Sequence, residues 1–298
     1  MNETARQALD LLQANPHAVA AIPDRIRSKP AMHLHMDFNT QANHFATPKT
    51  CQDLQVIPHQ SPGFRILRLE NPDESPEALN PLCFNEPIPL GCQIQPEGAN
   101  WVGTAGAPIK WIDARNEPHW GILSNWHVMA DGREELGRPI HQPTSQSPIC
   151  ARLENWNPIS TDDPNVIDAA LADSLIDDYH TTSFDILEIG HINPAYMSAH
   201  QGLDVLKHGR TTDLTPGVCI GTNAAVRVGY GDFTAEFVDQ DIYQGMDGPF
   251  SAPGDSGSLI VCAAKKRPTS LLFAGNDEMT IGNPVRYLIG RFQLEFAP

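Results

Sequence analysis

From about Glu86 onward the chain consists of short apolar runs that are interrupted every few residues by Gly, Pro, Asn or Asp. These runs include WVGTAG, IKWID, GILSN, ICARL, FDILEIG, LDVLKHG, AAVRVGY and SLIVCAA. Runs of this length between turn-forming residues are typical of β-strands, and many of them in succession predict an all-β sandwich or a pair of barrels. The runs do not alternate with helical segments as in a parallel βαβ sheet, and the sequence has no repeat of about 20 to 50 residues.

The first 85 residues carry weaker local signals. Glu3–Ala14 place apolar side chains at helical spacing and are followed by Asn-Pro, which predicts one short amphipathic helix. The following segment is rich in His, Pro, Asn and Gln, and only Phe64–Leu69 has the composition of a strand. We therefore predict an N-terminal, helix-containing extension at residues 1–85 and a β-rich domain at residues 86–298.

Charge and cysteine spacing exclude several classes of protein. The chain has 298 residues and a formal net charge of −16, which repels phosphate backbones and anionic lipid surfaces, so nucleic acid and membranes are not expected partners. The N-terminus lacks the basic and apolar regions of a secretory signal, and no apolar run is long enough to span a bilayer. The closest two of the six cysteines, Cys83 and Cys92, are nine positions apart, unlike the C-x-x-C pairs of zinc or redox sites. We expect a soluble cytoplasmic protein with free thiols.

A serine near the C-terminus has the setting of a nucleophile. Pro253–Ser258 read PGDSGS and directly precede the strand-like run Leu259–Val261. A serine between glycines on a tight turn can project its hydroxyl while neighbouring backbone N–H groups converge on one point, which a developing oxyanion needs. Ser256 is therefore the candidate nucleophile, and it needs a base.

The base and its orienting carboxylate are predicted from local context. His127 stands at the end of the apolar run GILSNWHVMA. Asp168 lies in NVIDAALA, and an acidic residue within an apolar run is costly unless it has a partner, such as an imidazole whose tautomer it fixes. Asp162, Asp163 and Asp173 are rivals for this role, with more polar surroundings.

These residues, in the order His, Asp, Ser, resemble the chymotrypsin/trypsin superfamily of serine peptidases, and the order differs from that of subtilisins and α/β-hydrolases. Over about residues 85–295, GTAG, GILSNWHV, NVIDAALA, KHGRTT, PGDSGS and LLFAG are most similar to intracellular trypsin-like proteins that include the plant Narrow Leaf protein and its bacterial relatives. The resemblance implies two six-stranded Greek-key β-barrels, peptide hydrolysis through an acyl-enzyme, and no metal or organic cofactor. It implies that Ser256 is the nucleophile, His127 the general base and Asp168 the orienting carboxylate. The N–H groups of Gly254 and Ser256 would then form the oxyanion hole.

Two positions bear on activation and specificity. Asp255 matches an aspartate that in secreted relatives pairs with the N-terminus made by zymogen cleavage. No activation junction precedes the predicted barrels, so we expect a site that is preformed or ordered by a partner. The residue six positions before Ser256, an aspartate in trypsin-like enzymes that select basic side chains, is Phe250. We therefore predict no trypsin-like preference for Lys or Arg, and an apolar or small-residue pocket with walls around Phe250, Phe273–Gly275 and Gly282.

Two further clusters allow more than one interpretation. Lys207–Thr212 read KHGRTT, which favours a structural turn between the barrels with Gly209 at positive φ over a substrate-binding loop. His33 and His35, with His44 nearby, could offer imidazoles to a metal, although surface or packed histidines are the simpler interpretation.

The sequence thus predicts an intracellular serine endopeptidase that acts on protein or peptide substrates with narrow or partner-controlled specificity. One alternative is a catalytically latent trypsin fold that acts as a protein-binding module. Another is a non-peptidase acyl hydrolase that uses the same triad. The resemblance leaves room for a regulatory protein partner and for a homo-oligomer, with residues 1–85 gating the cleft, binding a partner or supporting self-association.

Overall fold

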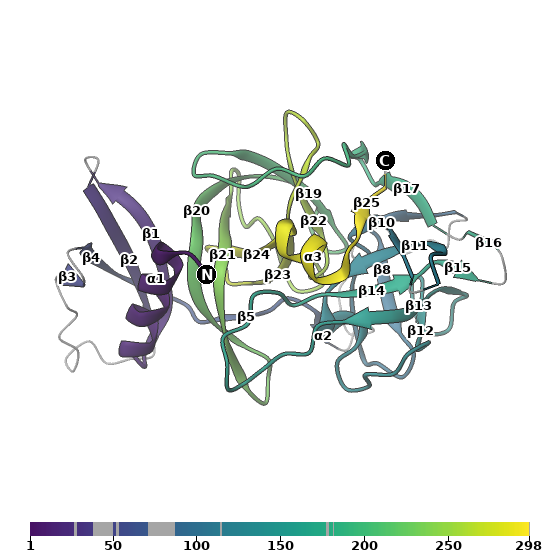
Figure 1. The fold of residues 1–298 in the computed structure, drawn as a ribbon, viewed down its shortest axis with the longest axis horizontal. Helices are drawn as coiled ribbons and strands as arrows, with labels where there is room; N and C mark the ends of the chain where they lie inside the picture. The colour runs from purple at the N-terminus through teal and green to yellow at the C-terminus, as the bar shows by residue number, and fades with distance from the viewer. Residues whose placement is uncertain are drawn as a thin grey trace.

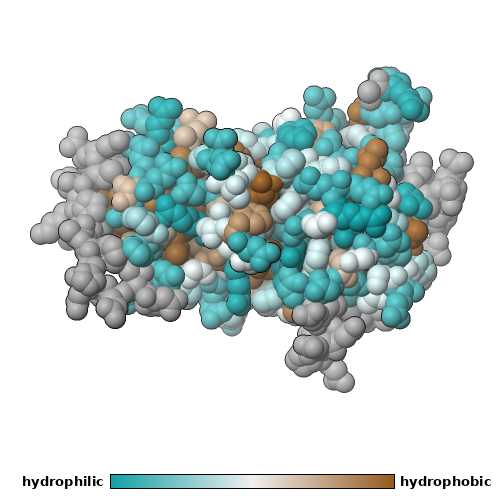
Figure 2. Space-filling model, turned by 90° about the horizontal axis from the view of Figure 1, so that it is seen from below, coloured by the Kyte–Doolittle hydropathy of each residue, from teal (hydrophilic) through white to brown (hydrophobic). Residues whose placement is uncertain are grey.

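The computed structural model describes residues 1–26, 29–37, 50–51, 54–70, 87–113, 115–176, 179–180 and 182–297. The described chain is mostly β-structure, and Figure 1 shows three parts in a row: the N-terminal segment, the second barrel and the first barrel. No helix in these ranges has both the length and the hydropathy needed to cross a membrane. The face in Figure 2 is largely hydrophilic, with scattered apolar residues.

The first barrel is one continuous path of antiparallel strands. Its order is β10 (Ala107–Ile112), β11 (Pro118–Ser124), β14 (Ala170–Asp173), β13 (Ile149–Trp156), β12 (Pro139–His141), β8 (Gln93–Pro96) and β9 (Trp101–Thr104). Only two residues separate β9 from β10, so these two strands form one bent strand and the path returns to its start. The short strands β25 (Glu295–Phe296) and β6 (Leu69–Glu70) flank it.

The second barrel closes through direct pairing of its first two strands. Its order is β19 (Asp204–Gly209), β22 (Leu259–Cys262), β23 (Pro268–Gly275), β24 (Thr280–Pro284), β21 (Thr234–Gly245) and β20 (Asp213–Gly229), and β20 pairs again with β19. The two closed barrels confirm the predicted all-β fold.

The N-terminal segment is built onto the second barrel. The helix α1 covers Glu3–Ala14 as predicted, with the Asn2 side chain capping its first turn. The strands β1 (Ala18–Ile26), β2 (Lys29–Asp37), β4 (Leu54–Ser61) and β3 (Thr50–Cys51) continue the sheet outward from β20. The apolar face of α1 packs on these strands and on β20 and β21. The predicted boundary at residue 85/86 lies outside the described residues and stays a prediction.

The remaining elements are short. They are β5 (Phe64–Ile66), β7 (Ile88–Leu90), β15 (Leu175–Ile176), β16 (Tyr179–His180), β17 (Thr182–Ile186), β18 (Gly190–His191), α2 (Trp126–Met129) and α3 (Val285–Phe292). The predicted strand at Phe64–Leu69 is present as two pieces, β5 and the start of β6.

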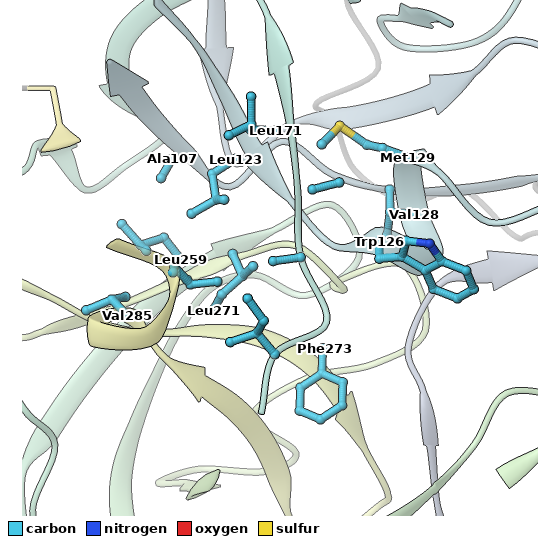
Figure 3. Packing of buried hydrophobic residues seen from close by; sticks show 14 of the residues in the cluster. Ala107, Leu123, Trp126, Val128, Met129, Leu171, Leu259, Leu271, Phe273 and Val285 are labelled. Atoms are coloured by element: carbon cyan, nitrogen blue, oxygen red, sulfur yellow. The ribbon is translucent and has the colours of Figure 1, made fainter. Parts of the chain in front are cut away.

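One hydrophobic cluster joins the barrels. In Figure 3, Leu123 and Leu171 of the first barrel lie on one side of the cluster, and Leu259 and Leu271 of the second barrel lie on the other. All four side chains are buried. This interface fixes the two barrels relative to each other, and the candidate site lies between them.

Candidate active site

Three side chains that are far apart in sequence form one chain of hydrogen bonds. His127 Nδ1 lies 2.5 Å from Asp168 Oδ2, and His127 Nε2 lies 2.8 Å from Ser256 Oγ. All three residues are fully buried. The structure therefore brings together the three residues singled out from sequence. Of the rivals, Asp173 has another partner, since its carboxylate accepts a hydrogen bond from His119 Nδ1 at 2.7 Å.

Each member of the chain stands where a strand begins or ends. The apolar strand β11 ends at Ser124, and the single turn α2 that follows carries His127. Asp168 precedes β14, and Asn125 Nδ2 donates to its backbone carbonyl at 2.8 Å. Its backbone N–H donates to Asn283 Oδ1 of the second barrel at 2.9 Å, so both barrels hold the segment that carries the carboxylate.

Tyr230, directly after β20, is a hydrogen-bond partner of Asp168 that the sequence did not indicate. Its hydroxyl donates to Asp168 Oδ2 at 2.7 Å, the same oxygen that faces His127. Burial, together with the charge of Asp168, raises the pKa of Tyr230 well above its usual range, so the hydroxyl remains a donor. The tyrosine thus helps to hold the Asp168 carboxylate in position to accept a hydrogen bond from His127.

Backbone N–H groups converge beside the serine. The N–H groups of Gly254 and Ser256 both donate to one carbonyl oxygen, that of Leu67, at 2.5 and 3.2 Å. Gly254 has φ +107° and Gly257 has φ +98°, a region that favours glycine and gives the turn this shape. The predicted pair of oxyanion donors is therefore aimed at a single point, and a peptide carbonyl of the same chain occupies it.

The first barrel holds the serine turn in place. Thr104 N donates to Ser256 O at 2.8 Å, and Thr104 Oγ1 donates to Gly254 O at 2.9 Å. A Cβ on Gly106 would overlap the carbonyl oxygen of Gly257. The GTAG motif thus provides the close contact between β9 and the turn.

The comparisons with solved structures agree with the two-barrel fold. Thermobifida fusca protease A aligns with a TM-score of 0.50 and 17% identity, covering 70% of this chain and 98% of that one. The chain has the two-barrel fold of the chymotrypsin-like serine proteases. A glutamic-acid-specific serine protease, described as using a histidine triad in substrate binding, aligns with a TM-score of 0.50 and 16% identity, over 70% of this chain and 100% of that one. Neither a protein-family model nor a protein of curated function matches the sequence.

In this chymotrypsin-like fold, a lysine side chain supplies the positive charge beside Asp255. Lys207 Nζ lies 3.3 Å from Asp255 Oδ2, and both side chains are fully buried. Asp255 also accepts hydrogen bonds from the N–H groups of Thr211, Thr212 and Ala252 and from the Thr212 hydroxyl. The aspartate is therefore satisfied without a new N-terminus.

The KHGRTT segment differs from its predicted form in two ways. It connects β19 to β20 within the second barrel rather than joining the two barrels. Gly209 is not at positive φ. Its lack of a side chain serves close packing instead, because a Cβ there would lie 2.5 Å from Asp255 Oδ1.

The residues predicted to line the specificity pocket are buried and apolar. Phe250 and Phe273 are 3% and 0% exposed, and Phe250 lies in a cluster with Leu67, Tyr243 and Leu272. An aromatic side chain in place of the trypsin aspartate leaves the pocket without a carboxylate at that position.

The histidines of β2 lie far along the sheet from this site. His33 Nδ1 is 2.7 Å from His59 Nε2, and His33 Nε2 is 2.8 Å from Asp24 Oδ2. Burial lowers the pKa of His35 to about 4. Among the described residues, no group of three or more His, Cys, Asp or Glu side chains is arranged to hold a metal ion. His44 lies outside those residues.

Proposed function

We propose that this protein is a serine endopeptidase. Ser256 Oγ attacks the carbonyl carbon of a bound peptide and passes its proton to His127 Nε2, while Asp168 accepts the Nδ1 proton in a hydrogen bond. The N–H groups of Gly254 and Ser256 stabilise the oxyanion, and one such donor contributes about 3 kcal/mol to the transition state. His127 then protonates the leaving amine, and water hydrolyses the ester on Ser256.

The observation that carries this proposal is the convergence of two N–H groups on one carbonyl oxygen beside a hydrogen-bonded Ser–His–Asp chain. A protease fold without catalytic activity would not need the N–H donors, the histidine and the carboxylate in this mutual arrangement. Here the three distances of the Asp–His–Ser chain and its flanking Tyr230 hydroxyl fall between 2.5 and 2.8 Å.

A fluorophosphonate probe tests the proposal, because it reacts quickly only with an activated serine in a working oxyanion site. Labelling is followed over a long time course and located by mass spectrometry, in the wild type, in Ser256→Ala and in His127→Ala. His191→Ala is the matched control, since the His191 side chain is 69% exposed. We expect labelling of Ser256 that is lost in the first two variants and kept in the third. A folded protein that never reacts, even when its cleft is open to the probe, would refute the peptidase proposal and favour a binding module.

We further propose that the protein acts in the cytoplasm and belongs with the intracellular trypsin-like proteins similar to the Narrow Leaf protein. The support is the KHGRTT and LLFAG motifs and the free, buried state of the described Cys92, Cys219 and Cys262, which suits a reducing compartment. Fractionation of cells that express the protein tests the location, and recovery from an oxidising compartment would refute it.

Narrow or partner-controlled specificity is part of the same proposal, because an unrestrained endopeptidase would damage its own compartment. Its support is the occupied cleft described above. Purified protein incubated with casein should leave the substrate intact, and broad degradation would contradict the proposal. A regulatory partner and a homo-oligomer are proposed on the resemblance alone, and mass measurement of the purified protein in solution tests the oligomer.

A further inference from the structure

The carbonyl that occupies the candidate oxyanion hole belongs to a segment that pairs with the second barrel at one end and with the first barrel at the other. Residues 64–70 include β5, Leu67, Arg68 and β6. The segment belongs to the N-terminal part of the chain, and β5 is labelled near the centre of the molecule in Figure 1. Its contacts on either side of the Leu67–Arg68 peptide bond show how it lies.

On the amino side of this bond, the segment lies as a peptide to be cleaved must lie. β5 pairs antiparallel with β23, with Ile66 opposite Ala274 and Arg65 opposite Gly275. Leu67 N donates to Phe273 O at 3.2 Å and lies 3.0 Å from Ser256 Oγ. An added strand on an exposed edge is a general mode of peptide recognition, because the backbone supplies affinity and the side-chain pockets supply specificity.

The Leu67 side chain packs among residues that were predicted to line the specificity pocket. It is 2% exposed and lies in the apolar cluster that contains Phe250 and Tyr243. A Cβ on Gly275 would lie 3.0 Å from Leu67 Cδ1, so the absence of a side chain at this glycine makes room for the leucine. The fit is to an uncharged aliphatic side chain.

On the carboxyl side of the bond, the segment is held by the first barrel. β6 pairs antiparallel with β9, with Leu69 opposite Val102 and Glu70 opposite Trp101. Arg68 lies over the Trp101 ring at 4.0 Å, donates to His127 O at 2.9 Å and forms an ion pair with Asp131. Both sides of the Leu67–Arg68 bond are therefore fixed.

We propose that residues 64–70 occupy the cleft as a built-in, substrate-like inhibitor, and that the pocket filled by Leu67 selects leucine or a similarly sized aliphatic side chain at the residue whose carbonyl Ser256 attacks. The inference rests on the proposed peptidase function. It goes beyond that function by naming the segment that closes the site and the class of peptide that the site accepts.

The segment is held on both sides of the Leu67–Arg68 bond, which explains why it inhibits the site rather than being hydrolysed. Attack by Ser256 on the Leu67 carbonyl would form an ester and free the Arg68 amine, which takes the proton from His127. Pairing of β6 with β9 keeps that amine beside the ester, at a high effective concentration. Reversal, which re-forms the peptide bond and returns the proton to Ser256, then outruns hydrolysis by water.

The test is the rate of fluorophosphonate labelling of Ser256 in the full-length chain carrying Leu67→Asp. A carboxylate in this apolar pocket has no partner, so the segment leaves the cleft and labelling should accelerate by about tenfold or more. Leu136→Asp is the matched control, because Leu136 is 65% exposed and its variant should label at the wild-type rate. Leu67→Ala, which leaves only a void, provides a second variant that is expected to fold, and thermal unfolding checks each protein.

Two additions identify the occupant and the pocket. A synthetic peptide of residues 62–70 should slow labelling of Leu67→Asp, whereas the same peptide with Asp in place of Leu should not. The Leu67→Asp protein should also cleave the 62–70 peptide after its leucine, about tenfold faster than the same peptide with Lys in place of that leucine. The wild-type chain should keep its intact mass on prolonged incubation.

The outcomes separate the two proposals. Equal labelling of wild type, Leu67→Asp and Leu67→Ala would overturn the built-in inhibitor and leave the peptidase proposal standing. Faster cleavage after lysine, or complete cutting of the wild-type chain at Leu67–Arg68, would also overturn the inference. If no folded variant labels at all, the proposed function fails, and this inference fails with it.

Discussion

Replacing Lys207 with methionine should destabilise the serine turn, because it removes the ammonium that pairs with the buried Asp255 carboxylate at 3.3 Å. Burial lowers the pKa of Lys207, and the charge of Asp255 opposes that shift. Breaking one partner of a buried ion pair costs about 3–5 kcal/mol. The N–H and hydroxyl donors around Asp255 remain, so we expect the lower end, about 3 kcal/mol in the free energy of unfolding.

The Lys207→Met change should also lower the reactivity of Ser256. Asp255 lies between Gly254 and Ser256, whose N–H groups are the candidate oxyanion donors, and a displaced carboxylate would shift both of them. Urea unfolding measures the stability, and fluorophosphonate labelling in a Leu67→Asp background measures the oxyanion site. We expect both to fall together.

Two controls separate the buried pair from general effects of losing a lysine. Lys110→Met breaks an exposed ion pair with Glu295, with side chains 41% and 70% exposed, and should change stability by less than about 1 kcal/mol. Lys207→Met combined with Asp255→Asn removes both charges and should recover part of the lost stability. A Lys207→Met protein as stable as Lys110→Met, or a double variant no more stable than Lys207→Met, would refute the reasoning.

Three further changes test other parts of the structure. Tyr230→Phe removes a hydrogen bond to the Asp168 carboxylate and should slow Ser256 labelling by about tenfold or more at unchanged circular dichroism; an unchanged rate would contradict its role. Asp241 is 1% exposed, and burial raises its pKa from 3.8 to about 7. The protonated carboxyl therefore contributes to the stability of the folded state at pH values below its unfolded pKa. About 4 kcal/mol of that free energy of unfolding should be lost as the pH rises to 7. Asp241→Asn should lack this loss in urea unfolding at several pH values, and a parallel decline in both proteins would exclude it. Gly106→Ala should cost about 1–3 kcal/mol or prevent folding, whereas Gly290→Ala, where a Cβ meets nothing within 4 Å, should not destabilise the protein; equal Tm values would argue against the close contact.

The three side chains of the candidate site could be singled out because each has a strong local signal. Ser256 lies in a turn whose glycines are needed for its shape, His127 stands near the end of an apolar run, and Asp168 is an acid within an apolar run. Such signals depend on neighbours within a few positions. The strand runs around them likewise predicted an all-β sandwich or a pair of barrels, because apolar runs and turn residues are local properties, and the family resemblance implied the two barrels.

The supporting residues could not be predicted for the opposite reason. Tyr230 is 62 positions from Asp168, and Lys207 is 48 positions from Asp255, so no local sequence pattern indicates either contact. Lysine is a residue type usually found at the surface, and only the closed barrel shows that β19 directs the Lys207 ammonium inward to Asp255. The role of Gly209 was mistaken in the same way, because its close neighbour is a distant carboxylate rather than its own turn.

The segment at residues 64–70 shows most clearly where local reasoning ends. Its composition predicts a strand, and a strand needs an edge with unpaired N–H and carbonyl groups. In the proposed peptidase the cleft is such an edge, because β23 and β9 would pair with a substrate backbone on the two sides of the attacked bond. A strand of the same chain makes the same hydrogen bonds, so the sequence of β5 and β6 cannot distinguish a structural strand from a bound peptide. What distinguishes them is the position of Leu67 O, which lies between the N–H groups of Gly254 and Ser256 where an ordinary barrel strand would have no need to place a carbonyl.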